Sequence, residues 1–121
     1  MTQELPVIDL ALGAKLLDGD EQVAKSMIQE LAAILPEGLE DLKSAYEAQD
    51  LKRLADIAHY LHGGTCYCGT PRLKAAAIAL EKRAKTSESF HEMRTSFESL
   101  CAEIDAVVDA CENGLDVGER C

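Results

Sequence analysis

Helical periodicity runs through almost the whole chain and strongly limits what it can fold into. The clearest case is the stretch 90–113, where apolar side chains recur every three or four residues: Phe90, Met93, Phe97, Leu100, Ile104, Val107, Val108 and Cys111. No segment of the sequence shows the sustained apolar–polar alternation that indicates a half-buried β-strand. The sequence therefore predicts an all-α protein.

Turn and capping signals divide this pattern into five helices. We expect helices over residues 9–17, 20–50, 50–69, 70–86 and 90–113, with Asp9, Asp20 and Thr70 as N-caps and with Gly69 and Asn113-Gly114 at two of the ends. Pro36 is a stop, a kink or a fresh first turn inside the second helix. The apolar side of that helix is expected to carry Val23, Met27, Leu31, Ile34 and Leu35.

Amphipathic helices joined by short turns can bury their apolar rows only against one another. We therefore predict an antiparallel four-helix bundle with an additional short N-terminal helix, as one domain over residues 1–114 followed by a disordered tail over residues 115–121. A chain of 121 residues buries roughly two thirds of its unfolded surface, so its core needs no disulfide or structural metal. We interpret the five cysteines as reduced thiols.

The chain carries 22 acidic and 12 basic side chains, a formal net charge of −10. Phosphate backbones and anionic membranes attract Lys and Arg stripes, which this sequence lacks, so we expect neither nucleic acid nor membrane contact. No stretch resembles a signal peptide or a membrane span. We expect a cytoplasmic monomer whose partner is a protein or a cation.

The segment AHYLHGGTCYCG, residues 58–69, departs from good helix design. Its two adjacent glycines each cost about 1 kcal/mol relative to alanine in a helix interior, which suggests that something approaches the backbone there. If Leu54 and Leu61 point inward, helical geometry places six residues on the opposite or flanking surface. These are Lys52, Ala55, His59, His62, Gly63 and Cys66, and we expect this surface to dock a partner.

An exposed imidazole beside a bare stretch of backbone suits a nucleophile that must enter another protein's site, and His59 fits that role. Imidazole attacks through one ring nitrogen while the other donates a hydrogen bond. Glu81 is the candidate acceptor, because an antiparallel helix that turns at Gly69 would bring it alongside His59. Glu81 could equally be a surface partner of Lys85, four residues on.

The residues of this region match a known family. The run His59-Tyr60-Leu61-His62-Gly63, followed by Gly69, Pro71, Leu73 and Leu80-Glu81, resembles the H-x-L-K-G motif and its downstream positions in histidine-containing phosphotransfer (HPt) domains. The LHG and YCG-x-P elements are especially similar to the C-terminal HPt domains of BarA/GacS-type hybrid sensor kinases. The resemblance spans roughly residues 7–112, and it departs from most of the family at His62, where lysine is usual.

This resemblance implies a phosphorelay intermediate of two-component signalling. His59 would accept a phosphoryl group from a receiver-domain aspartate and pass it to another receiver, with His62 contacting the phosphate and Glu81 orienting the imidazole. Gly63 would permit close approach. The resemblance further implies a domain that is no enzyme alone and binds no cofactor, with Mg²⁺ on the receiver. In a sensor kinase, the domain would lie on the cytosolic side of the inner membrane.

Two other classes of function remain open on the residues alone. His59, His62 and Cys66 share a helix face, and imidazole with thiolate is a plausible zinc set, so a helical metal-binding protein is one alternative. The spacing matches no familiar zinc module, and we expect no metal here. The other is an adaptor that docks a partner without chemistry. We interpret His91 as an ordinary surface residue, and Cys68, Cys101 and Cys111 as small apolar residues on or beside the core.

Overall fold

The computed structural model describes residues 5–17, 19–66, 68–86 and 89–113. These residues form five α-helices and one short 3-10 helix: α1 (Leu10–Leu17), α2 (Glu21–Glu47), α3 (Leu51–Thr65), α4 (Pro71–Thr86), η1 (Phe90–Met93) and α5 (Arg94–Glu112). The described residues include no strand, so the all-α prediction is confirmed.

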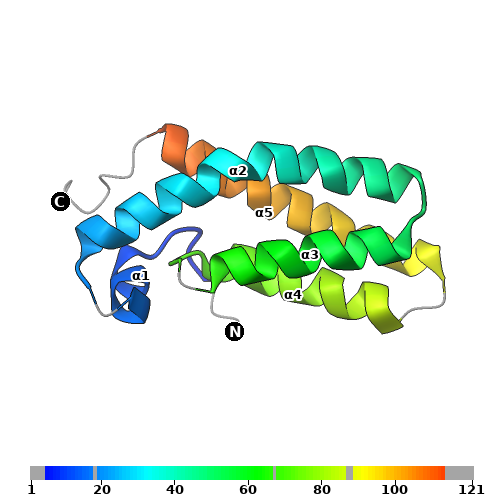
Figure 1. Cartoon of the computed structure of the whole chain (residues 1–121), viewed down its shortest axis with the longest axis horizontal. Helices are drawn as coiled ribbons and strands as arrows, with labels where there is room; N and C mark the ends of the chain where they lie inside the picture. The colour runs from blue at the N-terminus through cyan, green and yellow to red at the C-terminus, as the bar shows by residue number, and fades with distance from the viewer. Residues whose placement is uncertain (1–4, 18, 67, 87–88, 114–121) are drawn as a thin grey trace.

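Helices α2, α3, α4 and α5 form a closed ring in which each packs on the next and α5 packs back on α2 (Figure 1). The connections between α2 and α3, α3 and α4, and α4 and α5 lie at alternating ends of the bundle (Figure 1). Helices that follow one another in the chain therefore run antiparallel. The short helix α1 packs on the first half of α2, at the end where α3 turns into α4. The predicted four-helix bundle with an additional N-terminal helix is confirmed.

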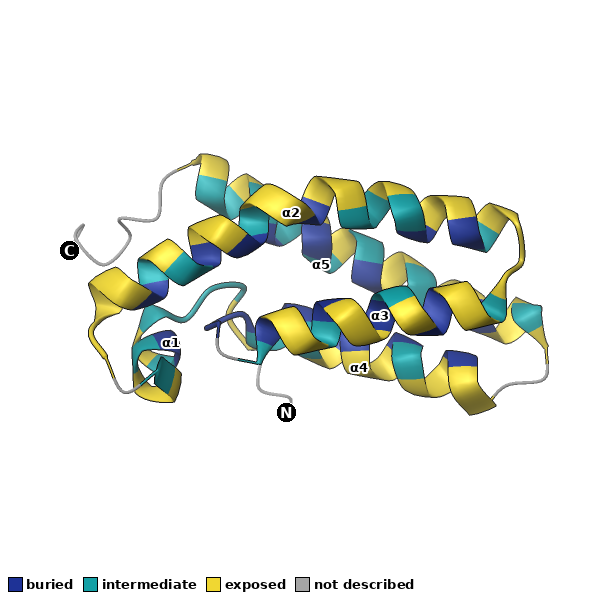
Figure 2. Ribbon diagram, viewed as in Figure 1, coloured by how far each residue is buried: buried dark blue, intermediate teal, exposed yellow. Residues whose placement is uncertain are grey.

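The core is the set of apolar rows that the four long helices turn toward each other (Figure 2). Each helix contributes fully buried side chains, among them Ile28, Leu35, Leu42, Leu54, Leu61, Leu73, Leu80, Leu100, Ile104 and Val107. At the far end of α2, the ring of Tyr46 stacks on that of Phe97, with 4.0 Å between centroids. This core holds α3 and α4 in fixed register over their length.

The structure corrects the expected face of α2. Val23 and Ile34 are 47% and 41% exposed, whereas Ala24 and Ile28 are buried. Apolar residues of α2 lie on both sides of the stripe that is buried, so periodicity alone does not locate the centre of that stripe. Its position is set by the contacts of α2 with α1, α3 and α5. Pro36 does not stop α2, which runs unbroken from Glu21 to Glu47 and changes direction near its middle (Figure 1).

Helix α3 ends at Thr65, four residues before the predicted stop at Gly69. The chain then turns through short-range hydrogen bonds, including Cys68 N–H to the carbonyl of Thr65 at 3.2 Å. The hydroxyl of Thr70 is buried without a hydrogen-bond partner, so the predicted side-chain N-cap of α4 does not form. The carbonyl of Thr70 still accepts the first helical bond, from Lys74 N–H at 3.0 Å.

The α3–α4 turn is fastened to the N-terminal segment. The amide of Asp9 donates to the carbonyl of Gly69 at 2.7 Å, and the Asp9 carboxylate caps α1 by accepting from Leu12 N–H. A side chain on Gly69 would run into the backbone of Asp9 and Gly13. Glycine at position 69 therefore allows the α3–α4 turn to pack against the N-terminal segment. This backbone contact, more than the termination of α3, explains why glycine occupies the position.

The last helix begins later than predicted, because residues 90–93 form the 3-10 turn η1 before α5 starts at Arg94.

Cys66, Cys68, Cys101 and Cys111 are free thiols, and burial raises the pKa of Cys68, Cys101 and Cys111. The predicted tail, residues 115–121, and Cys121 lie outside the described residues. Within the described ranges, no helix has the length and apolar character needed to cross a bilayer.

Candidate functional site

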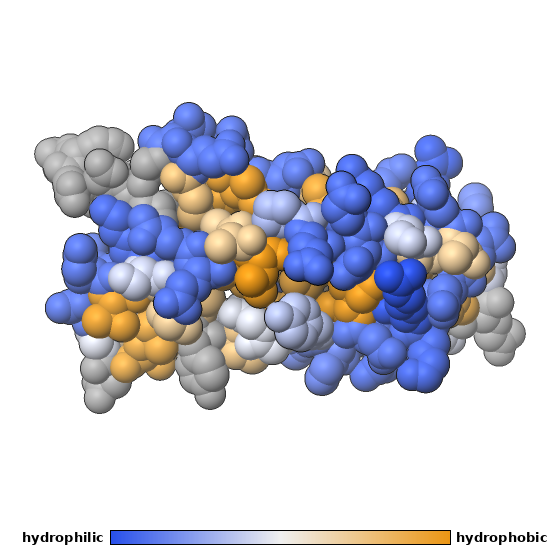
Figure 3. Space-filling view, turned by 45° about the horizontal axis from the view of Figure 1, so that its top comes forward, coloured by the Kyte–Doolittle hydropathy of each residue, from blue (hydrophilic) through white to orange (hydrophobic). Residues whose placement is uncertain are grey.

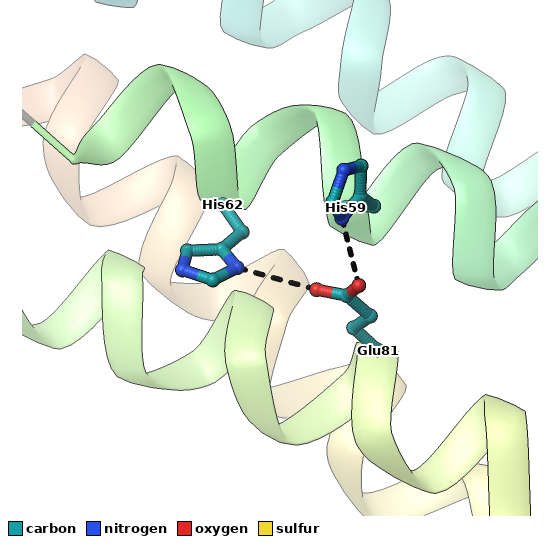
Figure 4. Close-up of side chains that lie close together, drawn as sticks. All are labelled: His59, His62 and Glu81. Atoms are coloured by element: carbon teal, nitrogen blue, oxygen red, sulfur yellow. Dashed lines mark hydrogen bonds and ion pairs between the residues drawn. The ribbon is translucent and has the colours of Figure 1, made fainter.

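Three polar side chains meet on the outer side of the α3–α4 pair (Figure 4). His59 and His62 project from α3, one turn apart, and Glu81 reaches toward them from α4. Nδ1 of His59 lies 2.8 Å from Oε2 of Glu81, and Nδ1 of His62 lies 3.2 Å from Oε1. The two oxygens of one carboxylate thus orient two imidazole rings.

The His59 ring stands out into solvent while the carboxylate that holds it is largely covered. The His59 side chain is 71% exposed and that of Glu81 only 12%. An ionised carboxylate can only accept hydrogen bonds, so the proton of a neutral His59 ring belongs on Nδ1. Its Nε2 then carries a free lone pair.

Lys85 completes the cluster from the next turn of α4. Its Nζ lies 2.8 Å from Oε2 of Glu81, the same oxygen that accepts from His59. The sequence left open whether Glu81 orients the imidazole or pairs with Lys85, and the structure shows both contacts at once. The hydrogen bond from Lys85, supported by those from His59 and His62, lowers the pKa of Glu81 to about 2 against the opposing effect of burial. Glu81 is therefore a carboxylate at neutral pH.

This lowered pKa predicts an acid-sensitive contribution to stability. A carboxyl group whose pKa drops from 4.5 to about 2 on folding stabilises the protein above pH 4.5, and this stabilisation is lost as the pH falls toward 2. We expect Glu81→Gln to be less stable than wild type at pH 6, with the difference in unfolding free energy shrinking between pH 4.5 and pH 2. Urea denaturation followed by circular dichroism measures it.

Glu98→Gln is the matched control, because Glu98 forms one exposed ion pair with Arg94, at 3.1 Å. Such surface pairs contribute about 0–1 kcal/mol, so we expect little change at either pH. A stability difference for Glu81→Gln that stays constant from pH 6 to pH 2 would contradict the prediction.

The predicted docking residues fall in different places. Lys52 is exposed and pairs with Asp56 at 3.2 Å, while Cys66 is half-buried and its Sγ donates to the carbonyl of His62 at 3.4 Å. Gly63 is exposed, and a Cβ there would meet no atom within 4 Å. Within the part of the chain that the structure describes, no contact therefore requires glycine at position 63.

Ala55 was predicted on the docking surface, and this is wrong. Its exposed fraction is 6%, and it belongs to the core. Helix α3 packs on both α2 and α4, so its buried stripe is wider than a stripe facing one partner. The prediction for His91 is confirmed, because this side chain is exposed.

A shallow cavity between α2 and α3 was missed from the sequence. It has a volume of about 360 Å³ and is lined by Ile34, Glu37, Gly38, Asp41, Asp56, Ile57 and Tyr60. Tyr60 directly follows His59 and is 64% exposed. The face drawn in Figure 3 is mostly hydrophilic, with apolar surface in a few separate areas. Ile34 was predicted on the apolar side of its helix and Tyr60 was not singled out, so no sequence signal pointed to this cavity.

The residues that could hold a metal ion are not those of the predicted set. One ligand atom each of His59, His62 and Glu81 lies within 4.8 Å of the others, and Cys66 is not part of this group. The Cys66 thiol points instead to the backbone of its own helix. A site built on the two histidines and Cys66 is therefore not supported by this geometry.

Comparisons with known proteins agree with this arrangement. The family model described as Hpt domain matches residues 22–114. The chain is 37% identical over 86 residues to sensor histidine kinase GacS of Pseudomonas protegens and 26% identical over 100 residues to signal transduction histidine-protein kinase BarA of Escherichia coli. These matches cover 71% and 83% of the chain but only 9% and 11% of the two kinases, so the chain spans about a tenth of their length.

A solved structure shows the same fold. The crystal structure of the HPT domain from a hybrid histidine kinase of Shewanella superposes with a TM-score of 0.81, covering 90% of this chain and 93% of that one at 24% identity. The bundle, the paired histidines of α3 facing a carboxylate of α4, and a family model matched over most of the sequence lead to one classification: this chain belongs to the Hpt domain family.

Proposed function

We propose that this protein is a phosphorelay intermediate, in which His59 accepts a phosphoryl group from a receiver-domain aspartate and passes it to an aspartate of another receiver. One observation carries the proposal: the exposed His59 ring is held through Nδ1 by an ionised carboxylate, with Nε2 free for attack. Its similarity to GacS and BarA, both named as histidine kinases, supports a place in such a pathway.

The transfer follows from this geometry. The lone pair on Nε2 attacks phosphorus, forming the N–P bond, while the P–O bond of the acyl phosphate breaks and the aspartate carboxylate leaves with the electron pair. The ring becomes positively charged, and Glu81 stabilises that charge through the Nδ1 hydrogen bond. No proton has to leave Nε2.

Phosphoryl transfer passes through a loose transition state that depends on positioning and on neutralising charge. The bundle supplies the positioning, because Glu81 fixes the angle of the ring. His62 and the ammonium of Lys85 both contact the Glu81 carboxylate that also holds His59. We expect these two groups to offset the negative charge of the phosphoryl group. We propose that Mg²⁺ and the acidic residues that bind it belong to the receiver, and that this domain needs no cofactor for transfer.

The receiver is proposed to dock over Gly63 and the cavity between α2 and α3. The bare backbone at Gly63 lets another main chain approach within contact distance of His59. Ile34 and Tyr60 offer apolar contact, and Glu37, Asp41 and Asp56 surround them with carboxylates. We expect the protein to act as a monomer in the cytoplasm, or on the cytosolic side of the inner membrane where it forms part of a sensor kinase.

The direct test is to incubate the purified protein with a ³²P-labelled receiver and Mg²⁺. We expect label to move to this chain, to survive alkali, to be lost in acid as phosphohistidine is, and to map to His59 by peptide mass spectrometry. Binding of the receiver without any label transfer would instead support an adaptor.

A further inference from the structure

His59, His62 and Glu81, on α3 and α4, together form a possible set of metal ligands. The proposed phosphoryl transfer does not use them in that role. Two imidazole nitrogens and a carboxylate oxygen, on two packed helices, lie within 4.8 Å of one another. Two histidines and one glutamate form a known zinc ligand set in which a fourth position stays open. We infer that His59, His62 and Glu81 form a zinc-binding site and that bound Zn²⁺ excludes phosphoryl transfer.

The ligand atoms lie within reach of one zinc ion after a movement of the side chains. Tetrahedral Zn²⁺ with bonds of about 2.0–2.2 Å holds its ligand atoms about 3.4 Å apart. Nδ1 of His59 lies 2.8 Å from Oε2 of Glu81, Nδ1 of His62 lies 3.2 Å from Oε1, and one ligand atom of each residue lies within 4.8 Å of the others. On binding through Nδ1, each neutral ring carries its one proton on Nε2, and side-chain rotation must bring the ligand atoms from within 4.8 Å to about 3.4 Å of one another. The exposure of His59 leaves room for that adjustment.

The charges around the cluster act in opposite directions. The chain carries a net charge of −10, which attracts a cation. Against this, the ammonium of Lys85 lies 2.8 Å from Oε2 of Glu81 and must withdraw before an ion binds. Its side chain is 57% exposed, so it can turn into solvent. Lys85 therefore weakens zinc binding without forbidding it.

The consequence for transfer rests on the proposed function, whereas the binding itself does not. Zinc on Nδ1 of His59 takes the place of the hydrogen bond to Glu81 and leaves the proton of the ring on Nε2, so Nε2 has no free lone pair with which to attack phosphorus. The ion also adds positive charge to the surface where a Mg²⁺-bearing receiver approaches. Zinc would act as a reversible inhibitor.

Isothermal titration calorimetry with ZnCl₂, on reduced protein freed of metal, tests the binding. We expect one ion per chain, at least about tenfold weaker binding in His62→Gln and in Glu81→Gln, and severalfold tighter binding in Lys85→Met. Cys66→Ser is the matched control for a thiol site and should bind as wild type does. Circular dichroism confirms that each variant is folded.

Two results would overturn the zinc site: no heat of binding at millimolar zinc, or an affinity that falls in Cys66→Ser and is unchanged in His62→Gln and Glu81→Gln. The inhibition is tested by adding zinc to the label-transfer assay. Zinc should slow labelling of wild type far more than labelling of His62→Gln. If zinc slowed the labelling of wild type and of His62→Gln equally, the inhibition would lie on the receiver. That result would refute the proposal that zinc bound at His59 excludes phosphoryl transfer. Absence of labelling without zinc would instead count against the proposed phosphotransfer.

Discussion

Replacement of His59 by glutamine is expected to reduce phosphoryl acceptance to the background of the assay. Glutamine keeps the size and polarity of the side chain but offers no lone pair of comparable nucleophilicity. The bundle should remain intact, because His59 is 71% exposed and contributes nothing to the core. The measurement is transfer of ³²P from a labelled receiver to the variant and to wild type, with thermal unfolding compared alongside.

The two other histidines provide matched controls. His91→Gln should accept phosphate at the wild-type rate, because His91 is an exposed residue of η1, outside the His59–Glu81 cluster. His62→Gln should still be labelled, more slowly, since it loses one ring beside the acceptor but keeps Nε2 of His59 and its bond to Glu81. Labelling of His59→Gln at the level of wild type would remove His59 from the role.

Replacement of Gly69 by alanine is expected to destabilise the fold strongly. The added Cβ would overlap the carbonyl of Asp9 and lie 2.9 Å from the amide nitrogen of Gly13, and both are backbone atoms that cannot rotate away. The hydrogen bond from Asp9 to Gly69 would be strained at the same time. Overpacking of this kind costs about 1–3 kcal/mol, which corresponds to a fall in Tm of roughly 3–15 °C for a domain of this size.

Gly63→Ala is the control for the helix effect of the same substitution. Its Cβ would meet no atom within 4 Å, and alanine favours a helix over glycine by up to about 1 kcal/mol, so we expect an unchanged or slightly raised Tm. Differential scanning calorimetry compares the two variants. A Gly69→Ala protein as stable as wild type would show that the Asp9–Gly69 contact does not hold the turn.

Much of the fold could be predicted, since four long apolar rows with few alternatives must pack on one another. The errors arose where a choice depends on neighbours. The buried side of α2 was misplaced toward Val23 and Ile34, because apolar residues flank its stripe. Ala55 was placed outside because the width of the α3 stripe depends on how many helices contact it. The end of α3 was placed at Gly69, although that glycine serves a contact with α1.

The site was predictable to a similar degree. Helical spacing put His59 and His62 on one face, and antiparallel geometry put Glu81 opposite His59, where it is found at 2.8 Å. The second bond, from His62 to Glu81, and the simultaneous contact of Lys85 depend on side-chain rotamers that spacing does not specify. The cavity beside Tyr60 depends on the separation of α2 and α3 and could not be read from either helix alone.

The sequence by itself determined that this chain is helical, how many helices it forms and which residue is the candidate acceptor, because periodicity, capping and turn chemistry act over a few residues. The tertiary structure alone decided which sides of the helices are buried, why Gly69 must be glycine, and how one carboxylate serves two imidazoles and an ammonium. Those features arise between segments distant in the chain, where the packing of whole helices sets the distances between atoms.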